Sequence, residues 1–234
     1  MKGLVIALQF LTRLPMPRVQ VEEGDFARSM RWFPAAGLVI GALVMGAAMI
    51  GLRIDSWIAA LCGLFIWVGV TGGLHLDGLS DLADARGAAH RDRARFLAVM
   101  ADPHVGSFGV MAIALQLIAK LVLLHAVAET GHMWPLVVIP FAARIGPLFW
   151  TLWLPPLHAG LGAQFRQGIA PTHLIIWLLP LAAGAACDPA MLAAPVLILL
   201  WGLWLKRNVG GVSGDCHGAG IELVETGMLL ALLL

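Results

Sequence analysis

Three aspartates, Asp77, Asp81 and Asp84, lie within eight residues of the segment GGLHLDGLSDLADARG. At positions i, i+4 and i+7 of a helix they point in nearly the same direction, so the spacing predicts one acidic face. Like charges on one face repel unless a cation neutralises them. Oxygen ligands suit a hard ion, and Mg²⁺ is the usual choice where phosphate oxygens complete the coordination shell. The three residues are therefore predicted to be catalytic Mg²⁺ ligands. Helix capping, the alternative, accounts for Asp77 alone.

Residues around this acidic face could bind a phosphate substrate. Arg86 follows the aspartates directly, and a guanidinium beside a metal site can share the charge of a phosphate. In the next motif, MADPHVGSFG, Asp102 is a candidate fourth metal ligand and substrate contact, and His104 is a candidate phosphate contact or base. His75 is a candidate catalytic proton acceptor. Three further arginines are interpreted as an exposed helix face that touches anionic lipid: Arg91, Arg93 and Arg95.

A second polar motif, GGVSGDCHGAG, begins at residue 210. Its glycines predict a flexible loop able to cradle phosphate, and a GxxxG-like packing segment is the alternative. Ser213, Asp215 and His217 are candidate substrate contacts, with Asp215 also a candidate metal ligand and His217 a candidate proton carrier. Lys120 and Arg144 stand alone within apolar stretches, and charges at membrane depth usually face a polar cavity, so both are predicted to bind substrate. No GxSxG, HExxH or P-loop motif is present. We therefore expect direct attack of an acceptor hydroxyl on a metal-activated phosphoryl group.

These motifs belong to a chain with the composition of a membrane protein. Of its 234 residues, 60% are hydrophobic and 12% are charged, unlike ordinary soluble domains. Several apolar stretches approach the roughly 20 residues that a helix needs to cross a bilayer. The sequence predicts one domain over residues 1–234, an all-α polytopic membrane bundle with about six to seven transmembrane helices and short re-entrant or interfacial helices. The clearest expected spans are 33–52, 57–74, 107–128, 133–153, 172–187 and 190–205.

The distribution of basic residues predicts the orientation of the chain. Cytoplasmic loops of membrane proteins carry an excess of lysine and arginine. If the N-terminus is cytoplasmic and each span reverses direction, Arg53 is the one basic loop residue on the outer side. The polar segments 75–106 and 206–221 then both face the cytoplasm and are predicted to share one site. The net charge of +1 gives no support for nucleic acid binding. Membrane lipid is an expected partner, and homo-oligomerisation stays open.

Longer motifs extend the pattern over nearly the whole chain: LQFLTRLPMP, RWFPAAGLVIG, GGLHLDGLSDLADA, MADPHVGSFG and GGVSGDCHGAGIELVE. In this order they resemble the cobalamin synthase family, the adenosylcobinamide-GDP ribazoletransferases. The resemblance implies a Mg²⁺-dependent enzyme of the bacterial cytoplasmic (inner) membrane. It implies transfer of the adenosylcobinamide-phosphate moiety of adenosylcobinamide-GDP to α-ribazole or α-ribazole 5′-phosphate. GMP would be released, and adenosylcobalamin or its 5′-phosphate formed, late in vitamin B12 synthesis.

The resemblance also extends to single positions, and it covers His75, Asp77, Gly78, Asp81, Asp84, Asp102, Gly106, Gly109, Gly214, Asp215, Gly218 and Glu222. Lys120 and Arg144 fall where this family has basic residues. The chain departs from the family pattern at Leu76, where relatives often carry an acid, so a ligand there is absent. A second departure is His158, which stands near the place of a usual arginine.

Two functions of other kinds are alternatives. A CDP-alcohol phosphotransferase of phospholipid synthesis would use aspartates in a similar way, but its DGxxAR signature is absent, because Asp77-Gly78 is followed by Ser80-Asp81, with no Ala-Arg pair at that spacing. A cation transporter would distribute its acids over several spans at mid-depth, whereas these acids cluster in one segment. Release of GMP from adenosylcobinamide-GDP would favour the ribazoletransferase, whereas ion flux in liposomes without release of GMP would favour transport.

Overall fold

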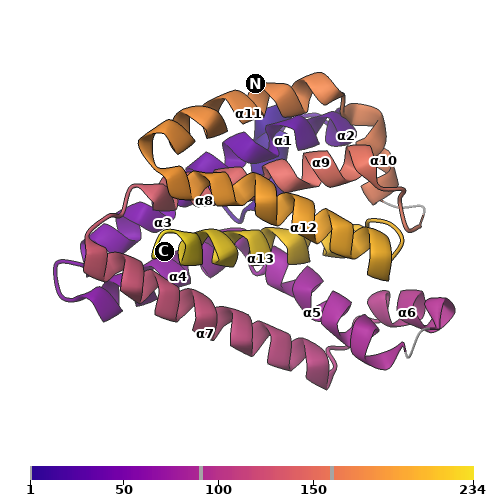
Figure 1. Ribbon diagram of the computed structural model, residues 1–234. Coiled ribbons are helices and arrows are strands. Elements are labelled where there is room, and N and C mark those ends of the chain that lie inside the picture. The colour runs from indigo at the N-terminus through magenta and orange to yellow at the C-terminus, as the bar shows by residue number, and fades with distance from the viewer. Residues whose placement is uncertain (1, 90–91, 159–160) are drawn as a thin grey trace.

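Helices make up nearly all of the ordered structure in the computed structural model, which describes residues 2–89, 92–158 and 161–234 (Figure 1). The described residues contain no strand, only an isolated bridge between Pro156 and Val212. The helices are α1 Lys2–Leu11, α2 Asp25–Ser29, η1 Met30–Trp32, α3 Phe33–Gly51, α4 Ser56–Thr71, α5 Leu74–Ala88, α6 Arg93–Met100, α7 Ser107–Thr130, α8 Pro135–Ala143, α9 Ile145–Trp153, α10 Leu161–Gly168, α11 Pro171–Cys187, η2 Pro189–Leu192, α12 Ala193–Asn208 and α13 Gly214–Ala231.

The predicted all-α polytopic membrane bundle is confirmed. Judged by the length and composition of its helices, it has fewer candidate membrane spans than the predicted six to seven. Among the described residues, four helical segments are long and apolar enough to cross a membrane: Asp25–Gly51, Ser107–Thr130, Pro135–Trp153 and Pro189–Asn208. The bent pair α4–α5 makes a fifth if it is counted as one span. The helix α11 is apolar but shorter, and α13 carries three acidic residues along its length.

Two consecutive glycines separate α4 from α5. Gly72 and Gly73 have φ values of +62° and +71°, a conformation that residues with a Cβ rarely adopt. The Gly72 N–H donates to the Gly69 carbonyl and the Gly73 N–H to the Val68 carbonyl, which ends α4. The axes of α4 and α5 differ by 83°. The turn therefore places the acidic motif on a separate helix, directly after an apolar one.

Helix α13 lies in the middle of the bundle and packs against α5, α7, α8, α9 and α12 (Figure 1). Its contact with α5 is close because both helices carry glycine there. A Cβ on Gly78 would lie 2.8 Å from the Asp215 Cα, and one on Gly218 would lie 3.2 Å from the His75 Cα. The predicted flexible phosphate loop was wrong from residue 214 onward, because these glycines serve helix packing. Ser213 caps the helix by accepting from the Cys216 N–H.

A proline break positions a buried arginine between α8 and α9. Pro147 has no N–H to bond the carbonyl four residues earlier, and the helix is interrupted at Arg144. The Arg144 side chain is fully buried, and its Nη1 donates to the Pro140 carbonyl at 2.9 Å. The stretch 154–171, between the expected spans 133–153 and 172–187, contains the short helix α10.

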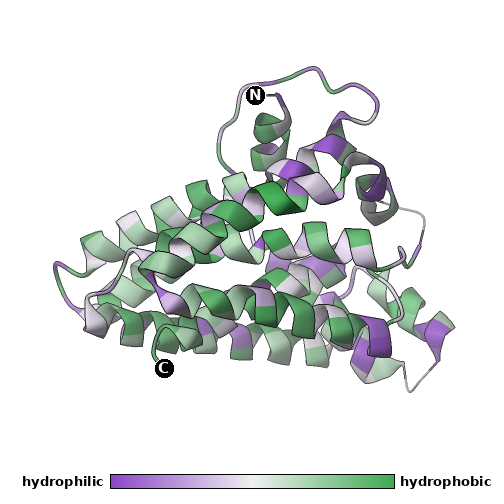
Figure 2. Ribbon diagram, turned by 45° about the horizontal axis from the view of Figure 1, so that its top comes forward, coloured by the Kyte–Doolittle hydropathy of each residue, from purple (hydrophilic) through white to green (hydrophobic). Residues whose placement is uncertain are grey.

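The loops separate into two groups at opposite ends of the bundle. Arg53 lines one cavity with His132, whose Nε2 lies 2.8 Å from Asp188 Oδ2, so the three loops that carry these residues converge at one end. At the other end, Arg86 and Arg93 each donate to a backbone carbonyl of residues 208–209 at 3.4 Å. Segments 75–106 and 206–221 are thus neighbours, as predicted. Hydrophilic residues gather around α6 at that end, while hydrophobic residues predominate along the long helices (Figure 2). Arg91 lies outside the described residues.

Candidate active site

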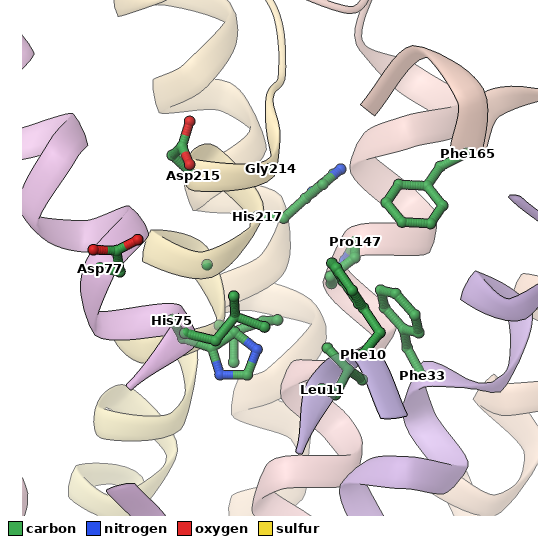
Figure 3. A pocket seen from close by; sticks show the side chains of 13 residues that line it. Phe10, Leu11, Phe33, His75, Asp77, Pro147, Phe165, Gly214, Asp215 and His217 are labelled. Atoms are coloured by element: carbon green, nitrogen blue, oxygen red, sulfur yellow. The ribbon is translucent and has the colours of Figure 1, made fainter. Parts of the chain in front are cut away.

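A cavity of about 190 Å³ opens where the N-termini of α5 and α13 meet α1, α3, α9 and α10. Its polar and apolar residues occupy different sides (Figure 3). The described residues that line it are Phe10, Leu11, Phe33, Leu74, His75, Asp77, Pro147, Phe165, Gly214, Asp215, His217, Gly218 and Ile221. Four predicted site residues, from two segments far apart in the chain, are therefore brought together: His75, Asp77, Asp215 and His217.

Carboxylates form the polar side of this cavity. The side chains of Asp77 and Asp215 face one another across the contact between α5 and α13 (Figure 3). Asp81 lies one turn further along α5 and is close enough to be repelled by both. His158, the residue near the place of the usual arginine, interacts electrostatically with Asp215. The result is a concentration of negative charge at the cavity wall.

Asp84 is placed differently from the other two aspartates of its motif. It is buried against the start of α7, where its carboxylate accepts from the Gly106 N–H at 2.7 Å and the Gly109 N–H at 2.9 Å. A Cβ on Gly109 would collide with this carboxylate. Asp84 thus satisfies two N–H groups at a helix terminus that have no partner within the helix. Its predicted metal ligation stays a prediction, because carboxylate oxygens have further lone pairs.

The acidic residues suit a magnesium ion that also binds substrate phosphate. Among the described residues, no group of three or more His, Cys, Asp or Glu side chains is arranged to hold a metal ion. Mg²⁺ commonly takes one or two carboxylates and completes its shell with water and phosphate. Asp77 and Asp215 supply such a pair, with Asp81 behind them. The donor chemistry of the cavity therefore fits Mg²⁺.

Asp102 and His104 lie away from the cavity, in the exposed loop between α6 and α7. The His104 backbone N–H donates to Asp102 Oδ1 at 3.0 Å, and His104 Nδ1 lies 2.7 Å from the same atom. These hydrogen bonds hold the pKa of Asp102 below its usual value. The structure gives the pair a loop-closing role and does not bring it to Asp77.

Arg86 and Ser213 do not line the cavity but hold elements and side chains around it in place. The Arg86 guanidinium lies 5.6 Å from the Trp204 ring centroid and donates to the Asn208 carbonyl, which ties α5 to the end of α12. The Ser213 hydroxyl donates to Asp215 Oδ2 at 3.2 Å. This bond orients one of the two facing carboxylates.

Lys120 and Arg144 lie in a buried ion network and not on the cavity wall. Lys120 Nζ is 2.7 Å from Glu222 Oε2 and 2.6 Å from Glu225 Oε2. Arg144 Nη1 is 2.8 Å from Glu225 Oε1. All four side chains are at most 4% exposed. The network contains two positive and two negative side chains, so its charges balance. Because these side chains come from different elements, the network joins α7, the α8–α9 junction and α13 within the bundle.

Both histidines of the cavity are buried and each has one ring nitrogen without a partner among the described residues. His75 Nδ1 lies 3.4 Å from Arg144 Nη2, and its Nε2 is unpartnered. His217 Nε2 lies 3.1 Å from the Thr151 hydroxyl, and its Nδ1 is unpartnered. Buried polar atoms are normally satisfied, so these two nitrogens are candidates for ligand contact.

An aromatic wall faces the carboxylates, and it was missed in the sequence. Phe10 stacks on Phe33 with ring centroids 5.8 Å apart, and Phe33 meets Phe165 edge-on at 5.6 Å. The three rings come from α1, α3 and α10, so no local pattern could have joined them. Leu76, the departure from the family motif, is buried and does not line the cavity.

Comparison with known proteins gives a consistent result. The cobalamin-5-phosphate synthase family matches residues 3–233. A protein of Novosphingobium aromaticivorans named adenosylcobinamide-GDP ribazoletransferase is 60% identical over 99% of this chain and 96% of its own length. A protein of the same name from Thiobacillus denitrificans is 51% identical over 98% of this chain and 94% of its own length. Another from Brevibacillus brevis is 39% identical over 100% of this chain and 98% of its own length. No solved structure matches the chain. The chain therefore belongs to the cobalamin-5-phosphate synthase family, membrane enzymes of cobalamin synthesis.

Proposed function

We propose that this protein transfers the adenosylcobinamide-phosphate moiety of adenosylcobinamide-GDP to α-ribazole or α-ribazole 5′-phosphate and releases GMP. Family membership supports the reaction, and its close relatives carry the name of this activity. The observation that carries the assignment to this cavity is the facing pair Asp77 and Asp215, opposite an aromatic wall. One side suits a charged diphosphate with its metal, and the other suits a flat aromatic base.

The reaction needs charge neutralisation more than a covalent intermediate on the protein. A ribazole hydroxyl oxygen forms a bond to the phosphorus nearest cobinamide, and the bond from that phosphorus to the bridging oxygen breaks. The bridging oxygen leaves with GMP, and the hydroxyl proton passes to a base. Asp77 and Asp215 are carboxylates at the cavity wall that could accept this proton.

Asp77 and Asp215, with Asp81 one turn away, would hold Mg²⁺ in this proposal. Bound Mg²⁺ would reduce the negative charge of the diphosphate and of the departing GMP. Without it, the carboxylates themselves would repel the diphosphate, because the described lining residues include no lysine or arginine. This absence is the physical reason for proposing a cation at the site.

The aromatic wall is proposed to receive the base of ribazole, an uncharged fused-ring system. A cavity of about 190 Å³ admits such a base but not a corrin ring, which must remain outside. Phe10, Phe33 and Phe165 offer ring faces and edges without the polar groups that would recognise guanine.

Replacing Phe165 with leucine tests this placement. We expect the KM for α-ribazole to rise about three- to tenfold, the value of one aromatic contact, with the KM for adenosylcobinamide-GDP unchanged. Phe26→Leu is the matched control, since Phe26 packs on Phe165 at 5.1 Å but does not line the cavity. Equal changes in both variants, or a rise in the other KM, would show that the base binds elsewhere. Steady-state kinetics with each substrate varied gives the answer.

The site is proposed to face the cytoplasm from the bacterial cytoplasmic membrane. The end of the bundle that carries the cavity also carries Arg86, Arg93, Lys206 and Arg207, whereas Arg53 lies at the other end. The positive-inside rule orients such a protein with its basic end inward. Its hydrophilic nucleotide substrate is then on the accessible side.

The direct test is an assay of purified protein in detergent with adenosylcobinamide-GDP, α-ribazole and Mg²⁺. We expect GMP and adenosylcobalamin in equal amounts, loss of both with EDTA, and recovery with added Mg²⁺. Supplying α-ribazole 5′-phosphate in place of α-ribazole tests which acceptor is preferred. Absence of GMP with both acceptors, from a monodisperse protein, would refute the proposed function.

A further inference from the structure

His75 is held on one side by a group that can only donate hydrogen bonds. Its side chain lines the floor of the cavity and is 3% exposed (Figure 3). Its Nδ1 lies 3.4 Å from Nη2 of Arg144, and arginine has five N–H donors and no acceptor. Nδ1 must therefore accept in this contact, and a nitrogen that accepts carries no hydrogen. The hydrogen of the ring is consequently on Nε2, the nitrogen without a partner among the described residues.

The donor in this contact is itself fixed. Arg144 Nη1 donates to Glu225 Oε1 at 2.8 Å and to the Pro140 carbonyl at 2.9 Å. Glu225 is held in turn by Lys120 at 2.6 Å. A guanidinium with two bonds on one nitrogen is locked in its plane, so its second nitrogen keeps a constant direction toward His75.

The buried Nε2–H needs an acceptor, and the cavity is where one can enter. Buried donors are rarely left without a partner in folded proteins. The nearest acidic residue in sequence, Asp77, also lines the cavity and is available for the metal in the proposed reaction. A substrate oxygen that enters beside Asp77 would satisfy the imidazole donor.

We propose that His75 is a hydrogen-bond donor to a phosphoryl oxygen of the substrate, with Arg144 and Glu225 as the positioning residues that set its tautomer. This inference rests on the proposed function for the identity of the ligand. It replaces the expectation that His75 accepts the hydroxyl proton, because Nε2 carries a hydrogen and Nδ1 is engaged. A donor aimed at phosphoryl oxygen stabilises the charge that develops there as GMP departs. The proton acceptor is then a carboxylate or His217.

The tautomer can be measured without any assay of activity. Nitrogen-15 NMR of histidine-labelled protein in lipid, with His75→Gln used to assign the signal, distinguishes a ring nitrogen that carries hydrogen from one that does not. We expect Nε2 of His75 to carry hydrogen and Nδ1 to carry none. Hydrogen on Nδ1 alone would overturn the proposal even if the enzyme is fully active.

Two substitutions test the role in the reaction. Glutamine can place an amide N–H near the position of Nε2–H but has no basicity, whereas alanine has neither property. We expect His75→Ala to lower kcat about 100-fold, as for loss of one transition-state donor, and His75→Gln to retain at least a tenth of the wild-type rate. Equal loss in both folded variants contradicts the donor role. A wild-type protein that releases no GMP refutes the proposed function instead, and leaves the NMR result to judge the tautomer.

Discussion

We expect Asp77→Asn to lower the rate of GMP release by about three orders of magnitude at saturating Mg²⁺, because it removes the negative charge of a proposed ligand of the ion that would face the diphosphate. Asparagine keeps the shape of the side chain, so packing between α5 and α13 is retained. The Asp77 side chain is exposed at the cavity. Among the described residues, it makes no side-chain hydrogen bond that the fold depends on. We therefore expect the melting temperature of the purified variant to stay within a few degrees of wild type. Single-turnover release of labelled GMP measures the chemical step.

Asp84→Asn is the matched control, since it makes the same chemical change two turns further along the same helix. Here the carboxylate accepts from the N–H groups of Gly106 and Gly109, and an asparagine NH₂ cannot accept. One buried N–H loses its partner, which costs about 1–3 kcal/mol of stability. We expect a lower melting temperature, with most activity retained at temperatures where the variant is folded. If Asp84→Asn loses activity as Asp77→Asn does and keeps its stability, then Asp84 binds the ion and the division of roles is wrong.

Asp215→Asn extends the comparison to the other side of the cavity. Because Asp215 faces Asp77 and comes from α13, its loss should raise the Mg²⁺ concentration needed for half-maximal rate. A variant with normal Mg²⁺ dependence would leave Asp77 and its own helix as the sole source of ligands. Titration of activity with Mg²⁺ separates the two outcomes.

The sequence predicted the acidic motif and the apolar spans because both are local. Asp77, Asp81 and Asp84 lie on one helix, and hydrophobic length alone identifies most spans. The glycines near Asp215 were misread, because a run of glycine predicts flexibility when seen alone. In the bundle Gly218 allows α13 to approach α5, and Gly220 lies against Trp150 and Trp201, and these contacts become visible only when the partner helices are known. Tertiary packing overrides local propensity at such positions.

Other features could not be predicted, because they join segments far apart in the chain. The aromatic wall takes one ring from each of three helices. Lys120 and Arg144 were recognised as unusual at membrane depth, and substrate binding was the natural interpretation. Their partners, Glu222 and Glu225, lie on α13 about 80 to 105 residues later in the chain. The two cations and the two carboxylates pair with one another, so the network stabilises the packing of the helices within the bundle.

Removing Lys120 should therefore destabilise the bundle strongly. In Lys120→Met, the Gln116 amide is the side-chain partner that the Glu222 carboxylate retains among the described residues, and both residues are buried. An uncompensated buried charge costs about 3–5 kcal/mol. We expect this loss in the free energy of unfolding, measured by reversible denaturation in mixed detergent micelles. The cation also leaves the Trp67 ring face, 4.5 Å from Nζ, which adds to the loss.

Adding Glu222→Gln to Lys120→Met should restore much of that stability, although it removes a second native side chain. The double variant keeps the Arg144–Glu225 pair at 2.8 Å and returns the network to equal numbers of positive and negative charges. Neutral replacement of a whole buried pair is often tolerated, whereas removal of one partner is not. Because Arg144 still holds His75, we also expect the KM for both substrates to stay near wild type. A double variant as unstable as the sum of two single losses would mean that Lys120 and Glu222 act independently. A selective rise in one KM would mean that Lys120 reaches substrate after all.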